Sequence, residues 1–125
     1  MNQPEAKHVL VVDDDAAYRR IVARMLVGAG FKVTVAEDFR AAMRVIDGSD
    51  PVDLLLTDIG LPLGTPHGLS LGSVARVQHP ALKVLFMTGD QDPAKFALFA
   101  PESTSVLAKP FDAEALIAAV NSMLA

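Results

Sequence analysis

The 125-residue chain contains no cysteine, so disulfide bonds and thiolate metal sites are excluded. Hydrophobic residues make up 51% of it, yet no segment approaches the roughly 20 consecutive apolar residues that a membrane span needs. Residues 1–7 are largely polar and lack the apolar stretch of a signal peptide. These absences predict a cytoplasmic protein that does not contact a membrane.

Runs of basic residues and a platform of stacked aromatic side chains are also missing. Together with a net charge of −4, this predicts that the chain has no nucleic-acid partner. The length is that of one domain with a real hydrophobic core. We expect a single domain over 1–125, with a polar tail at 1–6 and no output domain, so that any response passes through another protein.

Apolar, β-favouring runs alternate with segments of helical periodicity, which predicts an α/β fold built from βαβ units around a parallel sheet. Strands are predicted at 8–12, 32–36, 52–57, 82–87 and 104–108. Five helices fill the intervals. They are predicted from the end of the first strand to Gly28, at about 38–47, at 69–77, from Asp92 to before Pro101, and at 112–124 with Asp112 as the N-cap.

Polar side chains follow four of the predicted strands. Asp13, Asp14 and Asp15 come after the first strand, Asp58 after the third, Thr88 after the fourth and Lys109 after the fifth. The carboxyl ends of parallel strands share one edge of the sheet, and ligands bind in the crevice there. The sequence therefore predicts a small pocket with the groups needed to handle Mg²⁺ and a phosphoryl group.

The carboxylates suit a hard divalent cation. Asp13, Asp14 and Asp58 would repel one another at one sheet edge, and Mg²⁺ removes that cost because it prefers oxygen ligands. Asp58 can also act as a nucleophile and form an aspartyl phosphate. Capping of the first helix remains an alternative role for the aspartates at 13–15, and for Asp15 it is the expected one. A plain turn residue is the alternative for Asp58.

Thr88 and Lys109 add a hydrogen-bond donor and a point cation for phosphoryl oxygens. Each also has a simple alternative role, as a strand-end threonine and a solvated lysine. Lys109 precedes Pro110, and a bond of this type can be cis, so the sequence leaves the isomer open.

The motifs are Val-Val-Asp-Asp-Asp at 11–15, Asp58 with Leu-Pro at 61–62, Met-Thr-Gly at 87–89 and Lys-Pro-Phe at 109–111. In this order and spacing they resemble the receiver domain of response regulators, over about residues 7–124. The resemblance implies a flavodoxin-like, doubly wound sheet with strand order 2-1-3-4-5. It also implies a regulatory phosphoacceptor in bacterial two-component or phosphorelay signalling, rather than an enzyme.

The resemblance further implies roles for individual residues. Asp58 would accept a phosphoryl group from a phosphohistidine on a sensor histidine kinase or a histidine phosphotransfer protein. Asp14, Asp58 and the backbone carbonyl of Gly60 would ligate Mg²⁺, with Asp13 acting through water. Thr88 and Lys109 would bind the phosphoryl oxygens.

In the family, a shift of this threonine repacks the face formed by the fourth helix, the fifth strand and the fifth helix, which signals to a downstream protein. The aromatic residue that often assists this shift is replaced here by Val106, and the loop at 60–68 looks about two residues longer than usual. These departures keep open a protein–protein interaction module that works without phosphorylation. The alanine-rich last helix is compatible with a monomer or a weak homodimer.

A phosphatase of the haloacid-dehalogenase type is a further alternative. Asp13 and Asp15 fit the first half of its opening motif, but Ala17 stands where a threonine or valine is expected. After Lys109 only Asp112 and Glu114 could supply the late acidic pair that this family needs. The receiver interpretation therefore explains more of the motifs.

Overall fold

The computed structural model describes residues 6–59, 68–89 and 104–125. In chain order the elements are β1 (His8–Val12), α1 (Ala16–Gly28), β2 (Lys32–Ala36), α2 (Phe39–Ile46), β3 (Leu54–Asp58), α3 (Gly68–Gln78), β4 (Lys83–Thr88), β5 (Thr104–Ala108) and α4 (Ala113–Leu124). The described residues thus contain four of the five predicted helices. The helix predicted from Asp92 to before Pro101 falls in 90–103, and nearly all of the 60–68 loop falls in 60–67, so both lie outside the described residues.

The five strands form one parallel sheet in the order β2-β1-β3-β4-β5, which confirms the predicted topology. Two strands lie slightly further along the chain than predicted. β3 begins at Leu54 because Asp53 caps its start: the Asp53 side chain accepts a hydrogen bond from the backbone N–H of His8 at 2.8 Å. Parallel pairing then continues to Asp58, which lies opposite Met87. Asp58 and Thr88 are therefore the last residues of their strands and do not follow them.

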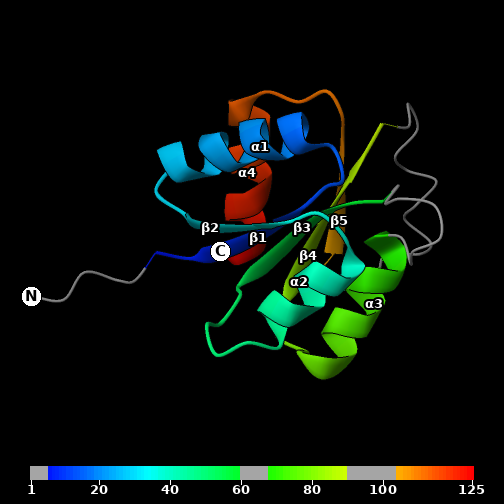
Figure 1. Cartoon of the computed structure of the whole chain (residues 1–125). Helices are drawn as coiled ribbons and strands as arrows, with labels where there is room; N and C mark the ends of the chain where they lie inside the picture. Colours follow the sequence, from blue (N-terminus) through cyan, green and yellow to red (C-terminus); the bar gives the residue numbers. More distant parts are fainter. Residues whose placement is uncertain (1–5, 60–67, 90–103) are drawn as a thin grey trace, which may run out of the picture.

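Helices cover both faces of the sheet, with α1 and α4 on one side and α2 and α3 on the other (Figure 1). The central strands are consequently buried on both faces, which explains why they read as continuous apolar runs. The core beneath α1 and α4, here called the α1/α4 core, consists of Val9, Val11, Val22, Leu26, Leu54, Leu56, Leu85, Met87, Leu116 and Val120. The core beneath α2 and α3 includes Leu10, Val12, Ala42, Ile46, Leu55, Leu71, Ala75, Val84 and Phe86.

Aspartate side chains cap three of the helices. Asp15 accepts hydrogen bonds from the backbone N–H groups of Ala17 and Tyr18, so its expected capping role is confirmed. Asp38 and Asp112 do the same for α2 and α4. Each cap satisfies N–H groups that have no partner within the helix.

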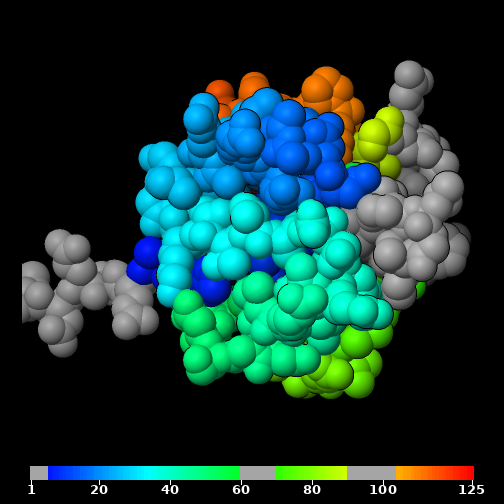
Figure 2. Space-filling view, in the orientation of Figure 1, coloured from blue at the N-terminus to red at the C-terminus, as the bar shows by residue number. Residues whose placement is uncertain are grey.

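The apolar residues of α1 face the core only in part. Val22 and Leu26 are buried, but Ile21 is 50% exposed. In the space-filling view, α1 and α2 form much of the surface on the side that faces the reader (Figure 2). Ile21 thus contributes to the outer surface of α1 and not to the core.

A glycine allows α3 to approach β4 closely. A Cβ atom added to Gly72 would lie 2.8 Å from Cζ of Phe86 and 3.3 Å from Cγ1 of Val84. The first distance is shorter than real Cβ contacts and the second is tighter than most of them, so the neighbouring side chains would have to shift. Gly72 therefore makes room for the buried Phe86 ring, which lies two residues before Thr88 on the same strand.

Candidate functional site

The predicted polar residues converge at the carboxyl edge of the sheet. Asp13 directly follows β1, Asp58 ends β3, Thr88 ends β4 and Lys109 directly follows β5. The backbone N–H of Lys109 donates to the carbonyl of Thr88 at 2.7 Å, which ties the end of β5 to that of β4. Thr88 is buried. The topology thus brings together groups that are up to 96 residues apart in sequence.

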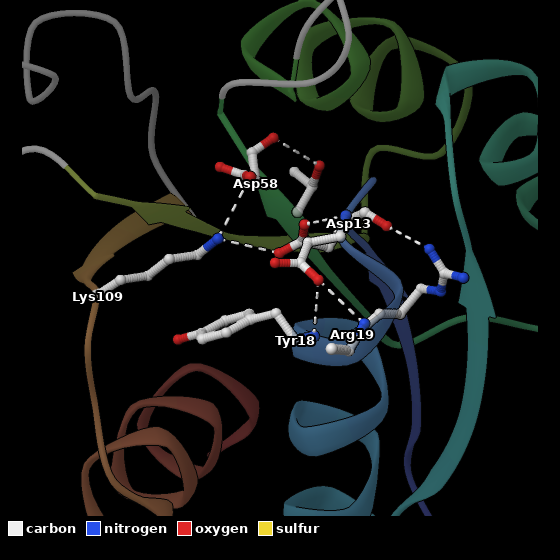
Figure 3. Close-up of polar contacts among 8 residues, drawn as sticks. Asp13, Tyr18, Arg19, Asp58 and Lys109 are labelled. Atoms are coloured by element: carbon white, nitrogen blue, oxygen red, sulfur yellow. Dashed lines mark hydrogen bonds and ion pairs between the residues drawn. The ribbon is translucent and has the colours of Figure 1, made fainter.

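The Lys109 side chain extends toward Asp13 and Asp58, and its terminal nitrogen contacts both (Figure 3). Its Nζ atom is 3.0 Å from Oδ2 of Asp13 and 3.3 Å from Oδ2 of Asp58. Burial by itself lowers the pKa of the Lys109 ammonium, but the hydrogen bond that the ammonium donates to Asp13 and the charges of both carboxylates outweigh this effect. The pKa is therefore raised above the ordinary 10.5. The bond between Lys109 and Pro110 is cis, which answers the question that the sequence left open.

Three carboxylates meet at this edge. Asp13, Asp14 and Asp58 each offer an oxygen, and these oxygens all lie within 4.8 Å of one another. Asp13 is buried, with its side chain 1% exposed, and accepts a hydrogen bond from the N–H of Asp15 at 2.9 Å. The Asp58 side chain is 16% exposed, and Asp14 lies at the surface.

This donor set fits a hard divalent cation. All three groups are oxygen donors, and the Lys109 ammonium supplies one positive charge against three carboxylates. Mg²⁺ is commonly held by one or two carboxylates together with waters. Gly60, the remaining predicted ligand, lies outside the described residues.

Two residues at the site were not predicted. The Nζ atom of Lys109 lies 4.3 Å from the centroid of the Tyr18 ring, and Nη1 of Arg19 donates to the backbone carbonyl of Asp13 at 2.6 Å. Both residues are in the first turn of α1, directly after the acidic cluster, and this position is the signal that could have pointed to them. Burial raises the pKa of Tyr18. Lys109 opposes this increase, whereas Asp13 and Asp58 add to it.

The family model for the response regulator receiver domain matches residues 9–121. The chain belongs to this family. A receiver domain is a switch of two-component signalling systems, and regulation is its role. None of the helices in the described ranges combines the length and apolar character that a membrane crossing requires.

Relatives of this receiver domain include both large and small proteins. It is 34% identical over 114 residues to the DNA-binding transcriptional regulator NtrC of Escherichia coli K12, an alignment that covers 90% of this chain and 24% of NtrC. The chain thus spans about a quarter of the length of that regulator. It is 32% identical over 126 residues to the response regulator receiver protein CpdR of Brucella abortus, covering 94% of this chain and 97% of CpdR.

Among solved structures, this receiver domain is similar to a response regulator receiver protein from Sinorhizobium medicae. The TM-score is 0.86 at 28% identity, and the match covers 96% of this chain and 95% of the other.

Proposed function

We propose that this receiver domain accepts a phosphoryl group on Asp58, and that the donor is a phosphohistidine of a sensor histidine kinase or a histidine phosphotransfer protein. The observation that carries the proposal is the position of Asp58 among the three carboxylates. It contacts the Lys109 ammonium, and its side chain is 16% exposed to solvent. Asp13 shares the lysine but is buried, so a donor cannot reach it in the same way.

In the proposed transfer, a carboxylate oxygen of Asp58 forms a bond to phosphorus, and the P–N bond to the donor imidazole breaks. The electron pair of that bond remains on the imidazole nitrogen. During transfer the negative charge is spread over the three oxygens of the phosphoryl group. Catalysis therefore consists mainly of positioning and charge neutralisation. Mg²⁺, held by Asp14, Asp58 and the Gly60 carbonyl with Asp13 acting through water, would supply part of that neutralising charge.

Lys109 supplies the second cation. Its ammonium already lies between Asp13 and Asp58, so it can pair with a phosphoryl oxygen after only a small movement. The Thr88 hydroxyl would donate a hydrogen bond to another phosphoryl oxygen. Because the Thr88 carbonyl accepts from the Lys109 N–H, a shift of one residue moves the other, and the neighbouring β5 and α4 can pass the change to a downstream protein.

The proposal is tested by incubating the protein with Mg²⁺ and acetyl phosphate and measuring its intact mass. We expect a gain of one phosphoryl group that hydroxylamine removes and that Asp58→Asn abolishes. Asp53→Asn is the matched control, because it makes the same substitution at the opposite end of β3, where the amide oxygen can still accept from His8. This control should be labelled like the wild type.

Two other results would contradict the proposal. Repeated hydrolysis of phosphate monoesters that depends on Asp13 would indicate a phosphatase. A protein that gains no phosphoryl group from acetyl phosphate or from a cognate kinase would instead be a phosphorylation-independent interaction module.

A further inference from the structure

The ammonium of Lys109 has a third neighbour besides its two carboxylates. The Tyr18 ring lies 4.3 Å from Nζ, measured to the ring centroid. Figure 3 shows the ring reaching from α1 to lie alongside the lysine, with the aspartates beyond Nζ. The negative face of an aromatic ring attracts a cation at this distance. The ammonium is therefore held between carboxylate oxygens and an aromatic ring.

Contacts independent of Lys109 hold the ring in place. The backbone N–H of Tyr18 donates to the capping side chain of Asp15 at 3.2 Å, which fixes the first turn of α1. The Phe111 ring meets the Tyr18 ring edge-on, with centroids 5.8 Å apart and an interplanar angle of 78°. Both rings pack against the α1/α4 core. The Tyr18 ring is thus held in a fixed position beside the flexible side chain of Lys109.

We propose that Tyr18 is a positioning residue of the phosphoryl site, and that its ring face keeps the Lys109 ammonium where the incoming phosphoryl group needs a counter-charge. The inference rests on the proposed function of Asp58. A lysine side chain has four flexible carbons and loses considerable rotamer freedom when it is held in one place. The ring removes that freedom before the donor arrives, so less of it must be lost during transfer.

The rate of phosphorylation tests this role. Tyr18→Leu, which removes the ring, should slow labelling by acetyl phosphate in Mg²⁺ by about fivefold, the effect expected from losing one partly exposed cation–π contact. Tyr18→Phe keeps the ring and should label at close to the wild-type rate. Phe31→Leu is the matched control, because Phe31 is a partly buried aromatic residue that packs against the same core and precedes β2, at the other end of the sheet.

The contact itself can be measured without phosphorylation. In NMR spectra of the full chain, the ring current should shield the ε-methylene protons of Lys109 in the wild type and in Tyr18→Phe, and this shielding should be lost in Tyr18→Leu. If Tyr18 only supported the fold, the shielding of the Lys109 protons would not depend in this way on whether residue 18 has a ring. If Tyr18→Leu does not fold, the wild-type spectrum decides, and unshifted Lys109 protons overturn the inference.

The remaining outcomes separate this inference from the proposed function. A labelled wild type with an equally fast Tyr18→Leu would refute the positioning role and leave Asp58 as the acceptor. If labelling is slowed equally in Tyr18→Phe, the effect belongs to the hydroxyl group. If it is slowed equally in Phe31→Leu, the effect is a general loss of packing. Either result contradicts the inference. A wild type that is never labelled contradicts the proposed function, and this inference with it.

Discussion

Replacing Lys109 with methionine should destabilise the protein strongly when no divalent cation is present. The substitution keeps a long apolar side chain but removes the ammonium that lies 3.0 Å from Asp13 and 3.3 Å from Asp58. Two carboxylates whose oxygens lie within 4.8 Å of each other would then lack their shared counter-charge. Repulsion between them would favour the unfolded chain.

The size of the effect follows from the burial of the three side chains. Breaking a fully buried ion pair by removing one partner costs about 3–5 kcal/mol. Here Lys109 and Asp58 are 20% and 16% exposed, so solvent screens part of the charge. Asp13 also keeps its hydrogen bond from the Asp15 N–H. We therefore expect the free energy of unfolding to fall by about 2 kcal/mol at neutral pH, below the fully buried range.

Urea unfolding of metal-free protein measures this loss. Lys32→Met is the matched control, because it removes the ammonium of the Lys32–Asp50 ion pair, whose side chains are 53% and 55% exposed. Exposed pairs contribute little, so the control should hardly change stability.

Two results would refute this reasoning. One is a Lys109→Met protein that is as stable as the wild type in metal-free buffer at neutral pH. The other is an equal loss of stability in Lys32→Met. It would mean that the burial of the ion pairs of Lys109 with Asp13 and Asp58 does not determine how much they stabilise the protein.

Four further predictions concern packing, the titration of Tyr18, stability in alkali and metal binding. Gly72→Ala should lower the free energy of unfolding by about 1 kcal/mol, because overpacking against Phe86 costs about 1–3 kcal/mol and the gain in helix propensity offsets about 1 kcal/mol. Stability equal to or above wild type in urea unfolding would contradict it. Tyr18 is the chain's one tyrosine, so ultraviolet absorbance should report a pKa above 10.0, and higher still in Lys109→Met. Both Tyr18 and Lys109 have raised pKa values, so the folded state retains more protons than the unfolded chain in alkali, and thermal stability should decline as the pH rises above about 10. A flat alkaline profile would contradict this sign. Mg²⁺ at 100 times its dissociation constant should add about 2.7 kcal/mol to the free energy of unfolding. At the same Mg²⁺ concentration Asp14→Asn should gain less, and an equal gain would exclude Asp14 as a ligand.

Much of the fold could be predicted because the strands carry their own signal. The central strands are buried on both faces and read as unbroken apolar runs, and each run ends at a polar residue. The start of β3 was misplaced because Val52 is apolar, whereas the chain conformation there depends on the hydrogen bond between Asp53 and His8. Ile21 fits the helical period of α1 but lies beyond the edge of the core, which a period alone does not define.

The candidate site was predictable in its members but not in its contacts. Topology alone brings Asp13, Asp58 and Lys109 to one edge. The position of the Tyr18 ring depends on how α1 packs beside the residues that follow β5, and neither periodicity nor spacing encodes that packing. The cis bond after Lys109 likewise has no signal beyond the proline itself.

The central claim is that Asp58, and neither of the two neighbouring carboxylates, accepts the phosphoryl group. Hydroxylamine converts an acyl phosphate to a stable hydroxamate, so treating the acetyl phosphate-labelled protein with it marks the acceptor for peptide mapping by mass spectrometry. We predict one hydroxamate, located at Asp58. A hydroxamate at Asp13 or Asp14, or none in a labelled protein, would contradict the account.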